Sequence, residues 1–466
     1  MRVDIFRQLA VQGAMIERLS SDSRRCAPGV AFLAYPGEVA DGRRHIPDAL
    51  ARGAAAVVWE HEGFAWDSSW KIPNAPVKNL KQQAGALAHE FYGRPSESLW
   101  VCGVTGTNGK TSCSQWIAAL LGKTAVIGTL GAGFPGSLSS AVNTTPDAVE
   151  LQFLLKEFRR QGASAVAMEV SSHGLAQGRV NGVRFDCALF TNLTHDHLDY
   201  HGTMAAYGEA KARLFEMPGL EVAVLNLDDP FGVELARRLA GRVRTIGYSL
   251  EPRDVPVDQQ LVWDPGMKIP ALGRFNVSNA LGVLGCLVAS GMALEEAKKR
   301  LAALPPVPGR MQALGEQPLV VIDYAHTPDA LENVLQALRP VAQQRRGQLL
   351  VAFGAGGDRD PTKRPRMGEI AARLADRVLI TSDNPRSENP LSIIEQIRAA
   401  APAAEVEADR ARAIEQLVLQ AHASDVILIA GKGHETYQVL RDRTVPFDDR
   451  QIAREVLTRL ARSGKA

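Results

Sequence analysis

GVTGTNGKT, residues 103–111, is the stretch of this chain that decides its fold. It follows the apolar segment 99–102 and precedes a helical pattern that begins near Ser112. A strand, a glycine-rich turn, a Lys-Thr pair and a helix wrap backbone N–H groups around a phosphate, to which the helix dipole adds attraction. In such loops the lysine, here Lys110, reaches the terminal phosphates, and the threonine, here Thr111, faces Mg²⁺. The stretch predicts an α/β domain with a phosphate-binding loop that takes ATP and Mg²⁺.

The loop departs from the usual pattern at one position. The glycine that normally stands five residues before Gly109 is replaced by Val104, so the motif is the variant Gly-x-x-Gly-Lys-Thr. Two other interpretations stay open from the loop alone: a glycine-rich turn without a ligand, and a nucleotide switch that binds partner proteins. The residues expected to contact ATP here are Gly106, Thr107, Asn108, Gly109, Lys110, Thr111 and Ser112.

Length and composition narrow the class of protein. At 466 residues the chain is long enough for about three domains. Its 45% hydrophobic and 22% charged residues are typical of a soluble globular protein, and its net charge of +2 argues against nucleic acid as the main partner. Five cysteines without a CxxC pair predict reduced, mostly buried thiols. We expect a cytoplasmic protein, because the N-terminus lacks a signal-peptide core and no apolar run reaches ~18 residues.

Three segments divide the chain. Residues 1–93 mix short strands and helices and end with a helix over 78–92. The glycine loop then opens a central α/β segment over 94–306, which closes at the proline-dense stretch 304–309, a natural linker. Residues 307–466 form the third segment. We therefore predict an α/β protein of three domains with these boundaries.

The third segment has the pattern of a doubly wound sheet. Apolar runs without alternation predict buried parallel strands over 319–322, 349–353, 378–381 and 426–430. Helical patterns lie between them, for example over 329–338 and 367–374. A polar loop follows each strand, and ligands of such sheets bind outside the carboxyl ends of the strands. The sequence therefore predicts a Rossmann-like domain with a binding cleft at that edge.

Residues 194–201 read THDHLDYH, and three histidines with two aspartates in so short a stretch indicate a metal ion. One interpretation is a dinuclear zinc site of the form His-x-His-x-Asp-His, but here the last histidine is displaced by one residue. A second is a polar loop whose histidines are satisfied locally. The interpretation we favour is that His197 helps to hold Mg²⁺ beside ATP, together with carboxylates because Mg²⁺ prefers oxygen.

Glu169 is a candidate for such a carboxylate. It ends the apolar run 165–168, which we expect to be a strand in the sheet of the glycine loop. A charge against an apolar run is costly without a cation partner. The alternative interpretation is a glutamate that caps a helix.

Four motifs taken together resemble the Mur ligases of peptidoglycan synthesis. They are TGTNGKT at 105–111, MEVSSH at 168–173, NLTHDHLDYHG at 192–202 and DNPR at 383–386. The resemblance runs essentially from end to end, in the order of the motifs and in the three-domain division. It implies a small α/β UDP-sugar-binding domain, a central ATP-binding domain with a parallel sheet, and a C-terminal Rossmann-like amino-acid-binding domain.

The resemblance also implies an activity. Such an enzyme is an ATP-dependent ligase that adds meso-diaminopimelate to UDP-N-acetylmuramoyl-L-alanyl-D-glutamate through an acyl phosphate, releasing ADP and phosphate. We expect it to be a monomer. A folylpolyglutamate synthetase would share the Gly-Thr-Asn-Gly-Lys loop, but it would need neither the N-terminal UDP-binding segment nor the DNPR motif.

Lys211 gains a role only from the resemblance, since by itself it is a lysine in a helical pattern. Its spacing after the histidine loop resembles that of the family's carbamylated lysine (N6-carboxylysine), whose oxygens suit a second Mg²⁺. The implied metal ligands are Thr111, Glu169, His197 and Lys211 as its carbamate; the implied catalytic residues are Lys110, Glu169, His197 and Lys211.

Further contacts are implied motif by motif. The resemblance assigns Asn279, Arg310, Asp323 and His326 to the nucleotide. It assigns to the UDP-muramoyl dipeptide Ser21, Ser23, Asn143, Thr144, Thr145, Ser171, Gln177 and Arg179, with the loop at 39–43 as a further UDP contact.

The acceptor amino acid is implied by the DNPR motif, because lysine-adding members of the family lack its arginine. Meso-diaminopimelate carries a second amino–carboxylate end that lysine lacks, and the planar guanidinium of Arg386 can grip a carboxylate with two parallel bonds. Arg364 is a further carboxylate ligand, and Asp383 and Glu435 receive ammonium groups. The residues implied to bind diaminopimelate are Arg364, Asp383, Asn384, Pro385, Arg386, Gly431 and Glu435.

Overall fold

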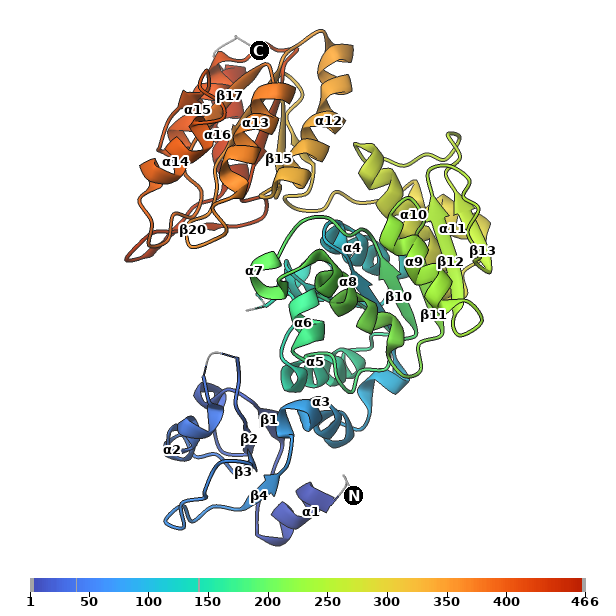
Figure 1. The fold of residues 1–466 in the computed structure, drawn as a ribbon, viewed down its shortest axis with the longest axis vertical. Helices are drawn as coiled ribbons and strands as arrows, with labels where there is room; N and C mark the ends of the chain where they lie inside the picture. The colour runs from blue at the N-terminus through green and yellow to red at the C-terminus, as the bar shows by residue number, and fades with distance from the viewer. Residues whose placement is uncertain (1–3, 39, 141–142, 463–466) are drawn as a thin grey trace. The chain divides into compact units, whose positions relative to one another are not determined.

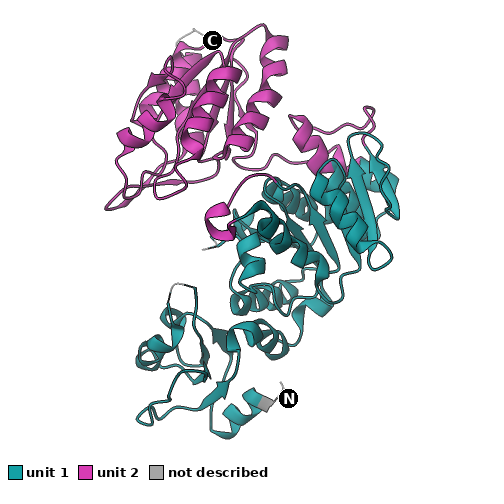
Figure 2. Cartoon of the chain, viewed as in Figure 1, with its two compact units in different colours: residues 1–193, 203–262, 281–298 teal, residues 194–202, 263–280, 299–466 magenta. Residues whose placement is uncertain are grey.

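The computed structural model describes residues 4–38, 40–140 and 143–462 (Figure 1). The chain groups into two compact units (Figure 2), of which unit 1 comprises residues 1–193, 203–262 and 281–298, and unit 2 comprises residues 194–202, 263–280 and 299–466. Helices and strands alternate in both units, so the chain is an α/β protein as predicted. The domain boundaries after residues 93 and 306 stay predictions.

Unit 1 begins with a four-stranded parallel sheet in the order β1-β2-β3-β4. Alternate side chains of β2 enter two different buried clusters, with Leu33 in one and Phe32 in the other, so both faces of this sheet are covered. Its elements are β1 (Arg18–Ser20), β2 (Val30–Ala34), β3 (Ala56–Glu60), β4 (Asn74–Val77), α1 (Asp4–Val11), α2 (Ile46–Ala51) and α3 (Leu80–Phe91), with 3-10 turns η1 (Ser23–Arg25), η2 (Gly42–His45) and η3 (Pro95–Ser98). Helix α3 confirms the helix predicted over 78–92.

The second sheet of unit 1 has the order β13-β12-β11-β10-β5-β9-β6-β7-β8, and all its neighbours are parallel except the pairs that involve β7. Its strands are β5 (Trp100–Thr105), β6 (Thr124–Gly128), β7 (Gly131–Phe134), β8 (Ser137–Ser139), β9 (Ala165–Glu169), β10 (Cys187–Phe190), β11 (Val222–Asn226), β12 (Arg244–Ser249) and β13 (Gln259–Val262). Its helices are α4 (Lys110–Leu121), α5 (Ala148–Arg160), α6 (Ser172–Ala176), α8 (Met204–Ala212) and α9 (Pro230–Leu239), with the 3-10 turn η4 (Arg213–Glu216).

Strand β5 lies in the middle of this sheet, between β9 and β10. The chain leaves β5 toward β6 on one side and later returns to β10 on the other, so the strand order reverses at β5. Ligands of open α/β sheets bind at the carboxyl edge at such a reversal. The glycine loop stands at this edge, and the pairing of Val104 with Glu169 brings the end of β9 beside it.

Unit 2 contains a six-stranded sheet in the order β14-β15-β19-β16-β17-β18, parallel except at β14. Its elements are β14 (Gln312–Leu314), β15 (Leu319–Asp323), β16 (Leu349–Phe353), β17 (Arg377–Ile380), β18 (Glu405–Val406), β19 (Val426–Ala430), α12 (Pro328–Arg345), α13 (Lys363–Leu374), α14 (Pro390–Arg398), α15 (Arg410–Gln420) and α16 (Asp449–Arg462). The four predicted strands and both predicted helices are confirmed. Unit 2 also holds α7 (Leu198–His201) and the hairpin β20 (Tyr437–Val439) and β21 (Thr444–Pro446); helices α10 (Arg274–Ala289) and α11 (Leu294–Leu301) run across the division between the units.

The strands of unit 2 read as continuous apolar runs because both faces of the sheet are buried. In β16, Val351 packs in the cluster on one face, and its neighbours Leu350 and Ala352 pack in the cluster on the other. All five cysteines of the chain are free and buried, as predicted. Among the described residues, no helix combines the length and apolarity needed to cross a membrane.

Candidate active site

The glycine loop, residues 103–111, is held from the end of β10. Gly106 has φ +145°, and a Cβ there would lie 1.9 Å from Thr191 Oγ1, so only glycine fits. The backbone N–H of Thr107 donates to Asn192 O at 2.8 Å. The side-chain oxygen of Asn192 accepts the next backbone N–H of the loop at 3.0 Å. These bonds hold the loop in one conformation against the neighbouring strand.

Helix α4 begins directly after the loop. Gly109 precedes it with φ +87°, and the carbonyl of Asn108 accepts a hydrogen bond of 2.6 Å from Thr191 Oγ1. Thr111 and Ser112 form the first turn of the helix and are buried. A helix N-terminus presents unpaired N–H groups and the positive end of the helix dipole. This geometry suits the phosphates of a nucleotide.

Two lysine ammonium groups meet at one carbonyl of the loop. Lys110 Nζ donates to Gly106 O and Thr107 O, both at 2.8 Å. Lys211 Nζ, from α8, donates to the same Gly106 O at 2.7 Å and lies 4.2 Å from the centre of the Tyr207 ring. Lys211 is only 1% exposed. Two like charges at one acceptor, one of them buried, are electrostatically unfavourable unless one is neutralised.

Glu169 does not cap a helix. Its side chain, 1% exposed at the end of β9, accepts hydrogen bonds from Thr129 N at 2.8 Å and Thr129 Oγ1 at 3.1 Å. A Cβ on Gly128 would lie 2.3 Å from Glu169 Oε1, so this glycine makes room for the carboxylate. Thr129 Oγ1 in turn lies 3.1 Å from Thr144 Oγ1. Thr129 is a neighbour of the predicted metal ligand that the sequence did not single out.

Several residues predicted to contact the UDP-muramoyl dipeptide form one hydrogen-bonded group beside Glu169. Thr145 Oγ1 donates a hydrogen bond to Glu169 O at 3.0 Å and lies 3.1 Å from Ser171 Oγ. Arg179 Nη1 donates to Thr145 O at 2.9 Å, and Arg179 Nε donates to Gln177 Oε1 at 2.9 Å. The structure therefore brings together residues that are separated by more than thirty positions in the sequence.

Tyr35 links this group to the first sheet of unit 1. Burial raises the pKa of Tyr35, Asp147 raises it further, and a hydrogen bond with Ser21 and the charge of Arg179 oppose the rise. Ser21, Asp147 and Arg179 therefore all influence the ionisation of the Tyr35 hydroxyl. Sequence reasoning missed Tyr35 and Asp147, because neither stands in a motif.

The other predicted UDP contacts are more dispersed. Ser23 is buried in the turn η1, and Asn143 is exposed. Val39, in the loop at 39–43, lies outside the described residues. Arg43 pairs with Asp41 at 2.8 Å and donates to two backbone carbonyls, so its guanidinium stabilises its own domain. A UDP contact by these residues stays a prediction.

His197 belongs to unit 2, whereas the glycine loop belongs to unit 1. It has φ +55° and is exposed, with Nε2 3.5 Å from Asp196 Oδ2. Among the residues that the structure describes, His195, His197, Asp199 and His201 do not form a group of three or more close ligands. The dinuclear zinc interpretation is therefore not supported.

The predicted nucleotide residues of unit 2 cluster after β15. Asp323 accepts backbone hydrogen bonds from Met311 at 2.7 Å and Ala325 at 2.8 Å. Burial raises the pKa of Asp323, and the charge of Arg310 opposes this rise. Arg310 Cζ lies 4.3 Å from the centre of the Tyr324 ring.

Of two further predicted nucleotide residues, Asn279 is buried and His326 is half-buried. His326 Nδ1 lies 2.8 Å from Tyr324 O, and burial lowers the pKa of His326. Asn279, on α10, is 6% exposed, and its Nδ2 lies 3.4 Å from Asn276 Oδ1. The ring centre of Tyr324 lies 5.2 Å from that of His434. We had predicted no role for either ring from the sequence.

His434 makes stability depend on pH. Burial, and then the positive charges of Arg310, Arg450 and Lys432, lower the pKa of His434 from 6.5 to about 3. Between these values the unfolded chain binds a proton that the folded chain does not, so stability falls as the pH drops below 6.5. We expect a decrease from pH 7 to pH 5 that is about 1–2 kcal/mol larger in the wild type than in His434→Gln, by urea unfolding. Equal decreases in both proteins would contradict this.

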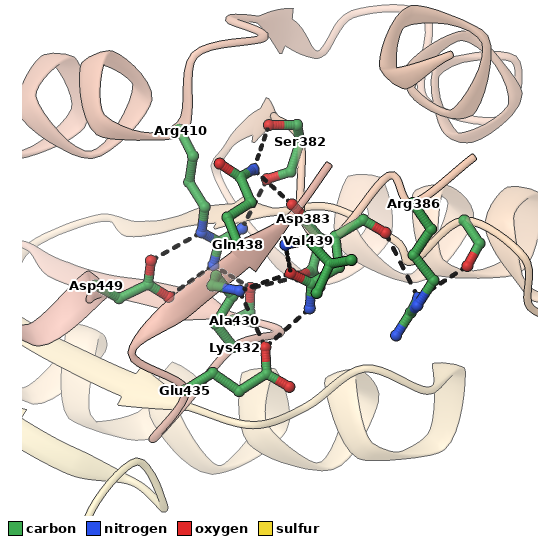
Figure 3. A network of polar contacts seen from close by, with 12 residues as sticks. Ser382, Asp383, Arg386, Arg410, Ala430, Lys432, Glu435, Gln438, Val439 and Asp449 are labelled. Carbon is green, nitrogen blue, oxygen red and sulfur yellow. Dashed lines mark hydrogen bonds and ion pairs between the residues drawn. The ribbon is translucent and has the colours of Figure 1, made fainter. Parts of the chain in front are cut away.

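Lys432 and Glu435 lie within one polar network of the predicted amino-acid site (Figure 3), and both bond Asn384. Lys432 Nζ is fully buried and donates to Asn384 Oδ1 at 3.1 Å and Glu435 Oε2 at 3.0 Å. Asn384 Nδ2 donates to the same Glu435 oxygen at 2.9 Å. Lys432 Nζ lies 3.8 Å from Asp383 Oδ1, a buried oxygen with no hydrogen bond. The two carboxylates predicted to receive ammonium groups thus already face an ammonium from the chain.

The hairpin β20–β21 fastens the DNPR loop. The backbone N–H of Val439 donates to Asn384 Oδ1 at 2.9 Å, and Val439 O accepts from the N–H of Arg386 at 3.1 Å. Gln438 Nε2 bonds both Ser382 Oγ and Asp383 O (Figure 3). Sequence reasoning missed the hairpin because it lies more than fifty residues after the motif.

Arg386 has φ +51°, an unusual backbone conformation for an arginine. Its Nη1 donates to Gly357 O at 2.8 Å. An open hollow of about 340 Å³, similar in size to small-molecule sites, is lined by Pro385, Arg386, Ser387, Glu388, Asn389, Pro390, Leu440, Arg441 and Asp442. Of the remaining predicted residues, Pro385 is buried, and Gly431 passes so close that a Cβ would lie 2.8 Å from Asp383 Oδ2.

Arg364 has a different environment from the one expected. It is 1% exposed and pairs with Glu388 through both terminal nitrogens, at 2.8 and 2.9 Å. It also donates to Gln396 Oε1 at 2.9 Å and to Gly356 O at 3.2 Å. The carboxylate that this arginine contacts is therefore one of the chain's own. A direct contact with an amino-acid substrate stays a prediction that this geometry does not favour.

Arg410 and Asp449 form a fully buried ion pair behind the DNPR loop, with Nε–Oδ1 2.8 Å and Nη2–Oδ2 2.7 Å (Figure 3). Arg410 also donates to Ser382 O and Ala430 O, the ends of two loops of the site. Asp449→Asn leaves a buried charge without its partner, so we expect it to lower the free energy of unfolding by about 3–5 kcal/mol in urea titrations. The double variant Arg410→Met/Asp449→Leu should recover part of the loss; a single-variant loss below about 1 kcal/mol would contradict the argument.

The fold and these sites define a P-loop α/β protein with a second, Rossmann-like sheet. Three family descriptions match successive parts of the chain: the Mur ligase family catalytic domain at residues 15–92, the Mur ligase middle domain at 104–287, and the Mur ligase glutamate ligase domain at 309–433.

Known proteins resemble the chain over nearly its whole length. It is 47% identical to a UDP-N-acetylmuramoyl-L-alanyl-D-glutamate–2,6-diaminopimelate ligase of Nitrosomonas europaea, over 96% of this chain and 94% of that protein. The enzyme of the same name from Chromobacterium violaceum is 50% identical, over 96% and 95%. A solved structure of such a ligase has a TM-score of 0.65 at 36% identity, over 96% and 95%. The chain belongs to the Mur ligase family.

Proposed function

We propose that this chain is the ATP-dependent ligase that adds meso-diaminopimelate to UDP-N-acetylmuramoyl-L-alanyl-D-glutamate in peptidoglycan precursor synthesis. The observation that carries the proposal is the Asn384–Lys432–Glu435 network with Arg386 beside it, in a chain about 50% identical to ligases of that name. A folylpolyglutamate synthetase or a nucleotide switch would give no reason for this network or for the resemblance of the first 92 residues to the Mur ligase family.

The reaction begins with activation of a carboxylate. An oxygen of the substrate's D-glutamate side chain attacks the γ-phosphorus of ATP, ADP leaves, and an acyl phosphate forms. A carboxylate is a poor electrophile, and phosphorylation supplies the leaving group. Lys110, fixed over the glycine loop, offsets charge on the transferred phosphoryl group. The amine of diaminopimelate then attacks the acyl carbon and loses a proton, and phosphate departs as the amide forms.

The chain's oxygen donors fit Mg²⁺. Thr111 offers a hydroxyl and Glu169 a buried carboxylate, and Mg²⁺ prefers such oxygen ligands. When bound, the ion would neutralise charge on the phosphates. We also assign His197 to the metal sites, and Lys211 once it is carbamylated.

Lys211 fits a metal only as its carbamate. The ammonium first loses a proton to solvent; the neutral amine then attacks CO₂, a carbon–nitrogen bond forms, and a second proton leaves to solvent. The product carries a negative charge and two oxygens in place of a buried ammonium. The shared contact of Lys110 and Lys211 with Gly106 O supports this change, because it removes the repulsion between two cations.

The amino-acid site supports diaminopimelate over lysine. Arg386 supplies a planar fork for the distal carboxylate, while Asp383 and Glu435 supply anionic oxygens for ammonium groups. Arg364 acts through Glu388, which holds the segment after the DNPR motif.

We assign the UDP-muramoyl dipeptide to Thr144, Thr145, Ser171, Gln177, Arg179 and the neighbouring Ser21. We further propose that the protein acts in the cytoplasm as a monomer.

The deciding experiment measures ATP-dependent phosphate release with UDP-muramoyl dipeptide, offering meso-diaminopimelate and L-lysine in parallel. Turnover that needs both the dipeptide and diaminopimelate is the expected result. Turnover with L-lysine but not with diaminopimelate would support a ligase and would overturn the proposed role of Arg386. Phosphate release without any amino acid would contradict the ligase itself.

A further inference from the structure

Three cysteines from distant parts of the chain meet in the core of unit 1. Cys102 lies in β5, Cys187 in β10 and Cys286 in α10, and all three are 0% exposed. Cys102 and Cys187 are directly opposite each other in neighbouring parallel strands, so their side chains point to the same face of the sheet. From the sequence we had predicted only that these cysteines are reduced, mostly buried thiols.

Two glycines bring α10 close enough for the third thiol to reach the other two. A Cβ on Gly285 would lie 2.6 Å from Val224 Cγ1, and one on Gly282 would lie 3.0 Å from Leu189 Cδ1. The helix therefore packs directly on β10 and β11 at these positions. As a result, Cys286 Sγ lies 3.8 Å from Cys102 Sγ and 4.0 Å from Cys187 Sγ.

We propose that Cys102, Cys187 and Cys286 form a binding site for a thiophilic cation, with Cu(I) as the best fit. A metal at about 2.3 Å from each of three sulfurs in a plane requires sulfurs about 4.0 Å apart. The three ligand atoms lie within 4.8 Å of one another, and two of the separations, 3.8 and 4.0 Å, match this requirement. In the part of the chain that the structure describes, this is the single group of three or more Cys, His, Asp or Glu so placed.

The ligand set selects the metal. Thiolates favour soft cations such as Cu(I), whereas Mg²⁺ and Ca²⁺ require oxygen. Structural Zn²⁺ is held by four protein ligands, and three sulfurs are available here. Binding exchanges thiol protons for the metal and releases them to solvent, with no change of oxidation state. Hydrogen bonds with Cys187 and Cys286 lower the pKa of the Cys102 thiol, whereas the hydrogen bond with Cys102 raises the pKa of Cys187 and burial raises the pKa of Cys286, so Cys102 is the thiol of the trio that loses its proton most readily.

The remaining cysteines provide matched controls. Cys26 and Cys113 are also buried and in no disulfide bond, but neither belongs to the trio. Burial alone therefore does not distinguish the proposed ligands from ordinary core cysteines, which behave as small apolar residues. The short distances between their sulfur atoms distinguish Cys102, Cys187 and Cys286 from the other two cysteines.

The test is a titration of the full-length protein with Cu(I) under anaerobic conditions, against a chromophoric Cu(I) chelator. We expect one Cu(I) per chain, bound at least 10-fold more tightly by the wild type and Cys26→Ser than by Cys286→Ser or Cys187→Ser. X-ray absorption of the wild-type complex should show three sulfur neighbours at about 2.3 Å. Circular dichroism checks that each variant is folded.

Several results would overturn the site. They are the absence of a tight first equivalent in the wild type, equal affinity in Cys286→Ser, or an equal loss in Cys26→Ser. If the serine variants do not fold, the wild-type absorption spectrum decides alone, because two sulfur neighbours, or nitrogen and oxygen neighbours, contradict the trio. The proposed cation site does not depend on the ligase activity, so none of these outcomes bears on the proposed function.

Discussion

Lys110→Ala is expected to lower kcat for ATP-dependent phosphate release by about 10³-fold or more. Its ammonium stands over the glycine loop, held by Gly106 O and Thr107 O at 2.8 Å. Removing one positioned donor from a developing negative charge typically costs 10²–10³-fold, and Lys110 adds a full positive charge to the donor. The measurement is steady-state phosphate release with saturating dipeptide and diaminopimelate.

The control for this variant is Lys299→Ala, which removes an exposed lysine from α11 and should leave kcat unchanged. The loop itself should persist in Lys110→Ala, because its main anchors are the bonds from Thr191 and Asn192. A variant that unfolds as the wild type does but keeps more than a tenth of kcat would show that the glycine loop does not hold the transferred phosphate. The ligase proposal would then lose its nucleotide site.

The local structure of the glycine loop could be predicted because its chemistry is local. A strand, a glycine with positive φ, and a helix N-terminus follow each other within a dozen residues. The strands of unit 2 could be predicted for a related reason, since a sheet covered on both faces needs continuous apolar runs. The anchors of the loop could not, because Asn192 is more than eighty residues away and carries no signal that it faces Asn108.

The amino-acid site shows the same limit more sharply. The DNPR motif identified Asn384 and Arg386, but not the fully buried Lys432, which bonds Asn384. In the sequence, Lys432 stands in a polar loop with glycines on either side, a pattern typical of an exposed turn. Arg364 is predicted to bind a substrate carboxylate, and the sequence did not indicate that it also pairs with Glu388. Charge partners between distant segments are set by tertiary packing, which residue type and spacing do not encode.

The buried thiols illustrate a third case. The sequence predicted free and buried cysteines, and this is confirmed. Their convergence depends on the register of β5 against β10 and on the close packing of α10, neither of which a spacing rule contains.

Arg386→Lys should reduce the preference for diaminopimelate over L-lysine. Each charge-assisted bond that the guanidinium makes to the distal carboxylate contributes about 1.5–3 kcal/mol, and an ammonium cannot form two parallel bonds. We expect kcat/KM for diaminopimelate to fall about 10–10²-fold as one of the two bonds is lost, with little change in the low activity on lysine. The readout is the ratio of the two kcat/KM values.

The ratio separates recognition from structure. Arg386 Nη1 also donates to Gly357 O, so its replacement could loosen the loop and reduce both activities together. Equal losses with both amino acids would assign Arg386 a structural role and overturn its role as selector. Arg398→Lys, an exposed change at the end of α14, is the matched control and should preserve both values. A selective loss with diaminopimelate follows only if the guanidinium contacts the carboxylate that lysine lacks, because that group is the difference between the two substrates at this end of the site.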